Sequence, residues 1–337
     1  MKKERNINLD IIRVFAFLSV ISVHFFLHSG FYNDDIFGIK DYFIVSLREF
    51  FMICVPLFIL LTGYLNTEKE VSKGYYKSII PKLFIYVLAA ICQLLLMKYY
   101  QNENLTLKSS INMIINFNIH YGWYMNMYIG LYLLIPFLNL IYKNLKNINE
   151  KKTLIIIFII LTCIPTILGK HQFLLSNWWI ILYPITYYFI GCYIKEYGLK
   201  ISKILNIILL IAFIFGYGII NYRVADGGLF QKLSYNHEWG GVMPFTLSIL
   251  VFNLLLNIKF KQSKIFSKLS SLVFAGYLVE WIFDRIAYDF LNARVTYESR
   301  IYYFIICILF VFICSLIVSY ILNLIVKLIT RRIYEKN

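Results

Sequence analysis

Long apolar runs alternate with short polar segments along all 337 residues of the chain. A helix that crosses a membrane needs about 20 apolar residues, and ten runs approach that length. They lie at residues 9–27, 43–65, 79–99, 121–142, 154–168, 173–194, 201–220, 240–258, 270–291 and 301–326. The pattern predicts an all-α fold, a polytopic membrane bundle of about ten transmembrane helices that forms one domain over residues 1–337.

Composition favours a membrane protein and argues against a nucleic-acid-binding one. The chain is 60% apolar and only 15% charged, yet its formal net charge is +15. Soluble domains carry roughly 45–50% apolar and about 25% charged residues. A chain this apolar has too little polar surface to present a nucleic-acid interface. The six cysteines all lie in apolar runs without a CxxC or Cys/His cluster, so we interpret them as small core residues.

The basic residues alternate from one loop to the next. Six segments hold 21 of the 33 Lys and Arg residues, whereas the loops between them hold eight. The six basic segments are the two tails and the loops at residues 66–78, 143–153, 195–203 and 259–268. Because Lys and Arg collect on the cytoplasmic side, both termini are predicted to be cytoplasmic, in a multi-pass protein of the plasma membrane.

The first run carries three ionisable residues, Asp10, Arg13 and His24, in a region where the bilayer makes charge costly. On a helix with about 100° and 1.5 Å per residue, these residues share one face, and Arg13 and His24 lie roughly 16 Å apart. They also make a cleaved signal peptide a poor interpretation of this run. An interfacial ion pair would equally explain Asp10 and Arg13, and a hydrogen-bonded core position would equally explain His24.

A second group of charges lies in the run at 270–291, which contains Glu280, Asp284, Arg285 and Asp289. This helix is expected to run from inside to outside, which places Asp284 at a depth similar to that of His24. Mutual pairing near the surface is the simpler explanation for Asp284, Arg285 and Asp289. It leaves Glu280, near the middle of the membrane, as a candidate functional residue.

The remaining histidines suggest no metal site. His28, His120, His171 and His237 fall in or beside predicted outer loops, where exposure to water explains them. Their spacing matches none of the patterns that hold a zinc ion. We therefore expect no metal cofactor.

Four stretches, taken in order, carry a resemblance to a known family. The first is LDIIRVFAFLSVISVH at residues 9–24, where ten residues separate Arg13 from His24. The others are VPLFILLTGYL at 55–65, GWYMNMYIGLYLLIP at 122–136 and SSLVFAGYLVE at 270–280. Together they make the chain resemble the acyltransferase family 3 membrane proteins, in which ten helices are usual.

The resemblance implies an activity and roles for several residues. Members transfer acyl groups, often acetyl, from cytoplasmic acyl-CoA to hydroxyl groups of surface polysaccharides, lipid-linked glycans or peptidoglycan. By resemblance, His24 is the catalytic histidine and Arg13 helps to hold the donor, with Asp10 and Glu280 as further catalytic candidates. A hydroxyl that attacks a thioester needs a base near its proton, and a histidine serves as that base or as a covalent acyl carrier.

Three lysines in the predicted cytoplasmic segment KGYYKSIIPK are candidates for binding the CoA phosphates. They are Lys73, Lys77 and Lys82, in a loop where family members place basic residues, often arginines. Lysine binds phosphate as a point charge and lacks the two-pronged geometry of arginine. Enforcing the orientation of the chain in the membrane is the alternative role for these lysines.

The sequence departs from the family pattern in two places and lacks one feature of some members. The second motif has Thr62-Gly63 where Ser-Gly is usual, and the late Tyr-Leu-x-His pattern ends in Glu280. A proton-handling role at the latter position would therefore fall to a carboxylate. Several relatives also carry an extracellular domain, which we do not find here, so the membrane domain or a partner is expected to handle the acceptor.

Two other classes of function fit a charged helical bundle. A secondary transporter or flippase for a glycan or small anionic substrate would also use intramembrane charges. Such proteins often contain internal repeats or helices broken at matched positions, and we find neither in this sequence. A structural or sensory subunit would leave the intramembrane charges unexplained.

Overall fold

The structure is a computed structural model that describes residues 5–33, 38–167, 174–225 and 239–334. Helices make up most of this part of the chain, which contains no strand, so the predicted all-α class is confirmed. The α-helices are α1 (Ile7–His28), α2 (Gly38–Phe51), α3 (Cys54–Asn66), α4 (Lys73–Lys77), α5 (Ile80–Tyr99), α6 (Leu107–Ile115), α7 (Gly122–Asn144), α8 (Ile148–Cys163), α9 (Tyr183–Tyr197), α10 (Lys203–Ala225), α11 (Val242–Asn257), α12 (Lys264–Arg294), α13 (Tyr297–Arg300) and α14 (Phe304–Tyr334). The 3₁₀ helices are η1 (Phe31–Asn33), η2 (Ile164–Thr166), η3 (Asn177–Leu182) and η5 (Ile301–Tyr303).

Seven helical stretches of the described chain are long and apolar enough to cross a membrane. They cover Ile7–His28, Gly38–Asn66, Lys73–Tyr99, Gly122–Asn144, Lys203–Arg223, Lys264–Arg294 and Tyr297–Thr330. Three further apolar runs form α8, α9 and α11, of 16, 15 and 16 residues. Because these helices are shorter than the roughly 20 residues of a full crossing, the count of ten spans stays a prediction.

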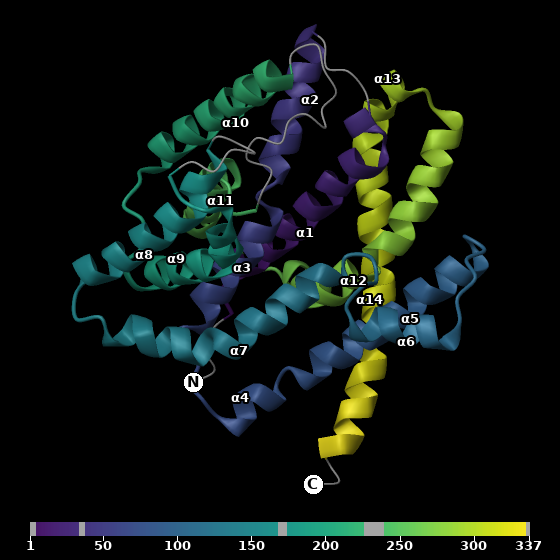
Figure 1. Cartoon of the computed structure of the whole chain (residues 1–337), viewed down its shortest axis with the longest axis horizontal. Coiled ribbons are helices and arrows are strands. Elements are labelled where there is room, and N and C mark those ends of the chain that lie inside the picture. The colour runs from purple at the N-terminus through teal and green to yellow at the C-terminus, as the bar shows by residue number, and fades with distance from the viewer. Residues whose placement is uncertain (1–4, 34–37, 168–173, 226–238, 335–337) are drawn as a thin grey trace. The chain divides into compact units, whose positions relative to one another are not determined.

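The chain divides into two compact units, whose helices are labelled in Figure 1. The first unit contains Met1–Glu68 and Asn139–Ser267, and the second contains Lys69–Leu138 and Lys268–Asn337. In the first unit, α1 packs against α2, α3 and α11, while α9 lies along α3 and α10 along α2. In the second unit, α5 packs against α6 and α14. The sequence prediction of a single domain stays a prediction.

Two glycines allow α3 and α9 of the first unit to approach closely. A Cβ atom on Gly63 would overlap the backbone carbonyl of Tyr188, and one on Gly191 would overlap that of Leu60. Small residues permit such contact between membrane helices because no side chain separates the two backbones. The Gly of the Thr62-Gly63 pair therefore has a packing role at this helix crossing.

Buried polar side chains connect the helices of the second unit. The Gln93 amide on α5 donates to the carbonyl of Leu278 on α12 at 2.7 Å and to that of His120, before α7, at 3.1 Å. The Ser319 hydroxyl on α14 donates to the carbonyl of Leu272 on α12 at 2.6 Å. Gln93 and Ser319 are fully buried. Their side chains therefore form hydrogen bonds within the protein, because water does not reach them.

Candidate functional site

Three of the predicted catalytic residues lie on one unbroken helix. α1 runs for 22 residues, and the side chain of its N-cap residue, Asn6, accepts a hydrogen bond from the backbone N–H of Asn8. Such a cap satisfies one of the donors that a helix start leaves open. The helix is continuous from Asp10 to His24, so these two residues and Arg13 lie on the shared face that their spacing predicts.

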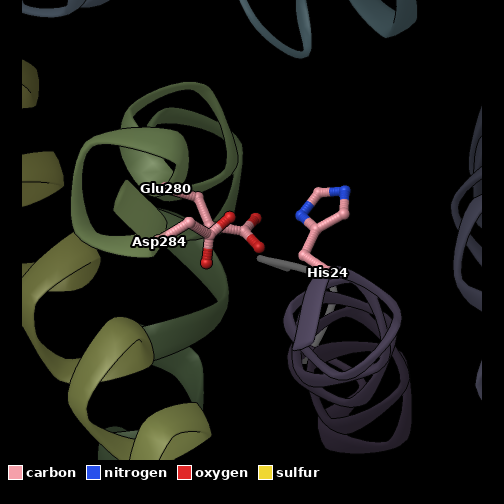
Figure 2. A group of neighbouring side chains, drawn as sticks. All are labelled: His24, Glu280 and Asp284. Atoms are coloured by element: carbon pink, nitrogen blue, oxygen red, sulfur yellow. The ribbon is translucent and has the colours of Figure 1, made fainter. Parts of the chain in front are cut away.

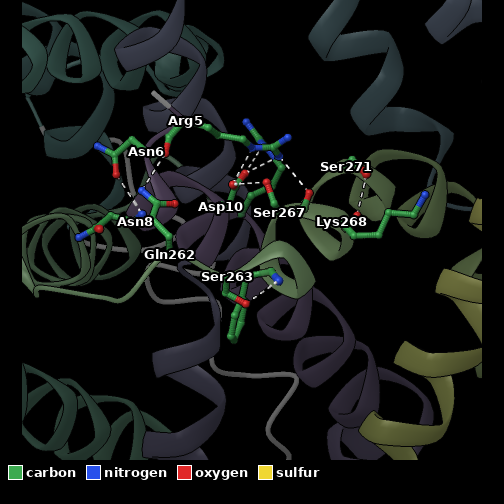
Figure 3. Close-up of polar contacts among 11 residues, drawn as sticks. Arg5, Asn6, Asn8, Asp10, Gln262, Ser263, Ser267, Lys268 and Ser271 are labelled. Carbon is green, nitrogen blue, oxygen red and sulfur yellow. Dashed lines mark hydrogen bonds and ion pairs between the residues drawn. The ribbon is translucent and has the colours of Figure 1, made fainter. Parts of the chain in front are cut away.

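Asp10 lies at the centre of a polar cluster in the first unit (Figure 3). Its two carboxylate oxygens accept hydrogen bonds from Arg5, both at 2.7 Å, and one also accepts from the Ser267 hydroxyl at 3.2 Å. The Arg13 guanidinium approaches the same carboxylate at 3.6 Å. Asp10 is only 3% exposed, and its hydrogen bond raises the pKa of Arg5 above the usual value.

The contacts of Asp10 favour a positioning role for this residue. Arg5 also donates to the backbone carbonyl of Ser267 at 3.0 Å, and Gln262 donates to the carbonyl of Arg5 at 3.2 Å. The cluster therefore ties the start of α1 to residues 262–267 of the same unit. The contact with Asp10 also holds the Arg13 guanidinium at this cluster.

We expect Asp10→Asn to lower the free energy of unfolding by about 1–2 kcal/mol. Hydrogen bonds to a charged group contribute roughly 1.5–3 kcal/mol, and solvent screening at the half-exposed Arg5 reduces this. Thermal unfolding of the purified protein measures the loss. Glu68→Gln, which removes a largely exposed ion pair with Lys143, is the control and should have almost no effect. An unaltered melting temperature together with lost activity would instead place Asp10 in the chemistry.

His24 lies near the C-terminal end of α1 and is partly buried. Its ring centre is 6.3 Å from that of His28, one helical turn further along. Figure 2 shows the His24 imidazole projecting from α1. A partly buried imidazole retains access for a reacting group, which a base or an acyl carrier requires.

Two carboxylates are fully buried on α12, in the second unit. Figure 2 shows the Glu280 and Asp284 side chains projecting from this helix, where their spacing is one turn. The Tyr121 hydroxyl donates to Asp284 at 2.7 Å, and the Tyr277 hydroxyl donates to the backbone carbonyl of Tyr121 at 2.9 Å. Tyr121, in the segment before α7, thereby holds the Asp284 carboxylate and is itself held by Tyr277 of α12.

The neighbouring charges on α12 pair with each other. Arg285 contacts Asp289 at 2.9 Å, and each side chain is about one-third exposed. This pairing agrees with the simpler explanation offered for these two residues, whereas Asp284 is bound by a tyrosine. His120 stacks on Trp281, with ring centres 3.8 Å apart. Burial, followed by the charge of Arg285, lowers the pKa of His120 below its usual value.

Lys73 and Lys77 project from α4 in the second unit. Tyr75 on the same short helix is buried and stacks on Tyr132 of α7, with ring centres 4.4 Å apart. The Tyr75 hydroxyl donates to the Tyr132 carbonyl at 2.6 Å, and the Tyr132 hydroxyl donates back to the Tyr75 carbonyl. Tyr75 therefore anchors α4, while both lysines are exposed and have no acidic partner among the described residues.

Lys82 has a different environment from the other two lysines. Its ammonium group donates to the Tyr128 hydroxyl at 2.6 Å and lies 4.6 Å from the centre of the same ring. The Tyr132 ring centre is 5.5 Å from this ammonium group. The faces of these two aromatic rings attract the Lys82 cation.

The structure also contains a buried ion pair that sequence reasoning gave no role. Arg48 and Glu49 on α2 are almost fully buried and bind each other, and Arg48 donates to the Tyr32 hydroxyl at 2.9 Å. The sequence signal that could have indicated this ion pair is the presence of two adjacent charged residues inside the apolar run at 43–65. His171 and His237, from the set of histidines considered for metal binding, lie outside the described residues.

Comparisons with known proteins give one match. The family model described as Acyltransferase domain matches residues 6–320, which is nearly the whole chain. No curated protein and no solved structure matches the chain. The matched region includes α1 with Arg13 and His24, α4 with Lys73 and Lys77, and α12 with Glu280. The resemblance inferred from the sequence motifs is confirmed.

Proposed function

Because the chain belongs to the acyltransferase family whose model spans residues 6–320, we propose that it moves an acyl group from acyl-CoA to a glycan. The donor is acyl-CoA on the cytoplasmic side, with acetyl as the acyl group. The acceptor is a hydroxyl group of a surface polysaccharide or lipid-linked glycan at the outer face of the plasma membrane. The enzyme is then a multi-pass membrane O-acyltransferase that needs no metal.

The arrangement of α4 is the observation that carries the choice of donor. CoA presents several phosphate groups, and an anion of this kind binds where cations are exposed and unneutralised. Lys73 and Lys77 are exposed on a helix that Tyr75 anchors to α7. A fixed backbone with two lysines one helical turn apart suits a phosphate site better than a mobile basic loop does.

Orientation in the membrane follows from the distribution of charge. With ten spans and both termini cytoplasmic, α4 lies on the cytoplasmic side and the C-terminal end of α1 on the outer side. His24 then meets an acceptor that approaches from outside, while Arg13 lies toward the donor side. The flexible arm of CoA carries the thioester between the two levels.

The proposed reaction assigns the proton transfer to His24. The acceptor hydroxyl attacks the thioester carbonyl carbon as His24 accepts the hydroxyl proton. Collapse of the tetrahedral intermediate breaks the carbon–sulfur bond, and the CoA thiolate leaves and takes up that proton. Alternatively, a His24 nitrogen attacks first, releases the CoA thiolate and passes the acyl group to the acceptor. Both routes yield an ester and free CoA.

We expect the double variant Lys73→Glu, Lys77→Glu to raise the KM for acyl-CoA at least tenfold. Reversing two charges removes two attractive contacts with phosphate and adds repulsion, and a tenfold change corresponds to about 1.4 kcal/mol. The kcat should change little, because the lysines bind the donor away from the reacting bond. Steady-state kinetics of the purified enzyme separate the two constants.

Lys152→Glu is the matched control for the charge reversal. Lys152 is exposed on α8, in another of the predicted cytoplasmic segments. Its replacement should leave the KM for acyl-CoA within twofold of the wild-type value. An equal rise in KM in the control and in the double variant would contradict a specific phosphate site on α4.

A further inference from the structure

A cavity of about 590 Å³ lies between α12 and α14 in the second unit. Its volume falls in the range of roughly 300–1,000 Å³ that is typical of ligand-binding pockets. Ile286 and Phe290 of α12 and Ile306 and Phe310 of α14 contribute apolar walls. The cavity lies at the C-terminal end of α12, the end opposite the basic segment at 259–268. Hydrocarbon is the kind of ligand that such walls bind.

One cationic side chain lies at this cavity without a neutralising carboxylate among the described residues. Asp289 also lines the cavity, but it forms its ion pair with Arg285. The Arg294 guanidinium lies 4.0 Å from the centre of the Phe290 ring, which is itself a cavity wall. Arginine binds phosphate through two parallel hydrogen bonds and stacks on aromatic rings at the same time.

We propose that this cavity binds the single hydrocarbon chain of a polyisoprenyl-phosphate-linked acceptor and that Arg294 binds the lipid phosphate. The proposal rests on the proposed function, because it identifies the acceptor of the same enzyme as a lipid-linked glycan. In the proposed orientation, the cavity lies at the outer side of the membrane. The choice of this lipid over a phospholipid rests on the acceptor of the proposed function and on the position of Arg294 on the helix that also carries Glu280 and Asp284.

The position of the cavity along α12 supports this assignment. Arg294 is ten residues beyond Asp284 and fourteen beyond Glu280 on one continuous helix. At about 1.5 Å per residue, the phosphate site lies roughly 15 Å from Asp284 and roughly 21 Å from Glu280 along the helix axis. In the proposal, the sugars attached to the phosphate extend along this separation, and one helix carries both the lipid site and the candidate carboxylates.

Photocrosslinking of a polyisoprenyl monophosphate that carries a photoreactive group tests the proposal on the purified full-length protein. Ile306→Trp fills the cavity and should reduce saturable labelling at least tenfold. Ile305→Trp is the matched control, because Ile305 and Ile306 are 62% and 64% exposed, respectively, and Ile305 does not line the cavity. Arg294→Gln should weaken binding at least fivefold, and Arg294→Lys should recover part of it. Melting temperatures establish that each variant is folded.

Competition experiments distinguish the source of the lipid. Unlabelled polyisoprenyl monophosphate should compete well, the unphosphorylated polyisoprenol less well, and phosphatidylglycerol poorly. Equal competition by phosphatidylglycerol, or unchanged labelling of Ile306→Trp, would overturn the proposal. Acyl transfer by the wild-type enzyme to a water-soluble glycan tests the proposed function separately. If that transfer occurs while the cavity variants bind the polyisoprenyl monophosphate normally, the proposed lipid site is wrong and the proposed function stands.

Discussion

Replacing His24 with alanine is expected to reduce acyl transfer by about 10²–10⁴-fold, the contribution typical of a positioned acid–base group. His24 is partly buried on the continuous helix that also carries Arg13, at the spacing of the family's first motif. The loss should fall on kcat, because the imidazole acts on the acceptor proton or carries the acyl group. Transfer of labelled acetyl from acetyl-CoA measures the rate.

His28→Ala is the control for the His24 variant. It removes an imidazole one turn further along the same helix, where no role in the chemistry is proposed. Its activity should stay within a few fold of wild type, and both variants should reach normal abundance in the membrane. Near-normal transfer by a folded His24→Ala protein would contradict the assigned mechanism.

The second large effect is expected at Glu280, for which we propose a proton-handling role in the same reaction, at the position where the resemblance implies a histidine. Glu280→Gln keeps the size of this fully buried side chain but cannot exchange a proton, so transfer should fall by about 10²-fold or more. Glu280→His introduces the residue that the resemblance implies at this position and should keep considerably more activity than Glu280→Gln. The ratio of the two kcat values is the measurement.

Structural damage is distinguished from lost proton transfer by comparing the two Glu280 variants. Glutamine is nearly isosteric with glutamate, and histidine is not, so a purely structural position would tolerate glutamine better. Higher activity in Glu280→Gln than in Glu280→His would therefore contradict a proton-handling role. Glu103→Gln, at an exposed carboxylate of the same unit, controls for nonspecific effects of removing a charge.

Hydropathy predicted the helical class and the location of the apolar runs because a membrane helix must be apolar along its length. It did not predict the interruption of the run at 43–65 between α2 and α3, or the amphipathic helix α6. Hydropathy averaged over an apolar stretch does not reveal a helix that ends inside that stretch. It likewise does not distinguish a full crossing from the shorter α8, α9 and α11.

Periodicity on a single helix predicted part of the site, and tertiary contacts supplied the remainder. The shared face of Asp10, Arg13 and His24 follows from helix geometry alone. The partners Arg5, from the tail, and Tyr121, from the segment before α7, come from distant or irregular segments. A spacing rule applies within one helix, so it does not indicate which side chain from elsewhere completes a hydrogen bond.

The most direct test of the central claim is acyl transfer by the purified protein in lipid vesicles. Acetyl-CoA labelled in its acetyl group is supplied with a lipid-linked glycan. Our account predicts that label moves to the glycan as an alkali-labile ester and that free CoA appears in equal amount. The His24→Ala protein should show neither product. Movement of the glycan across the bilayer without acyl-CoA and without ester formation would contradict the account and favour a transporter.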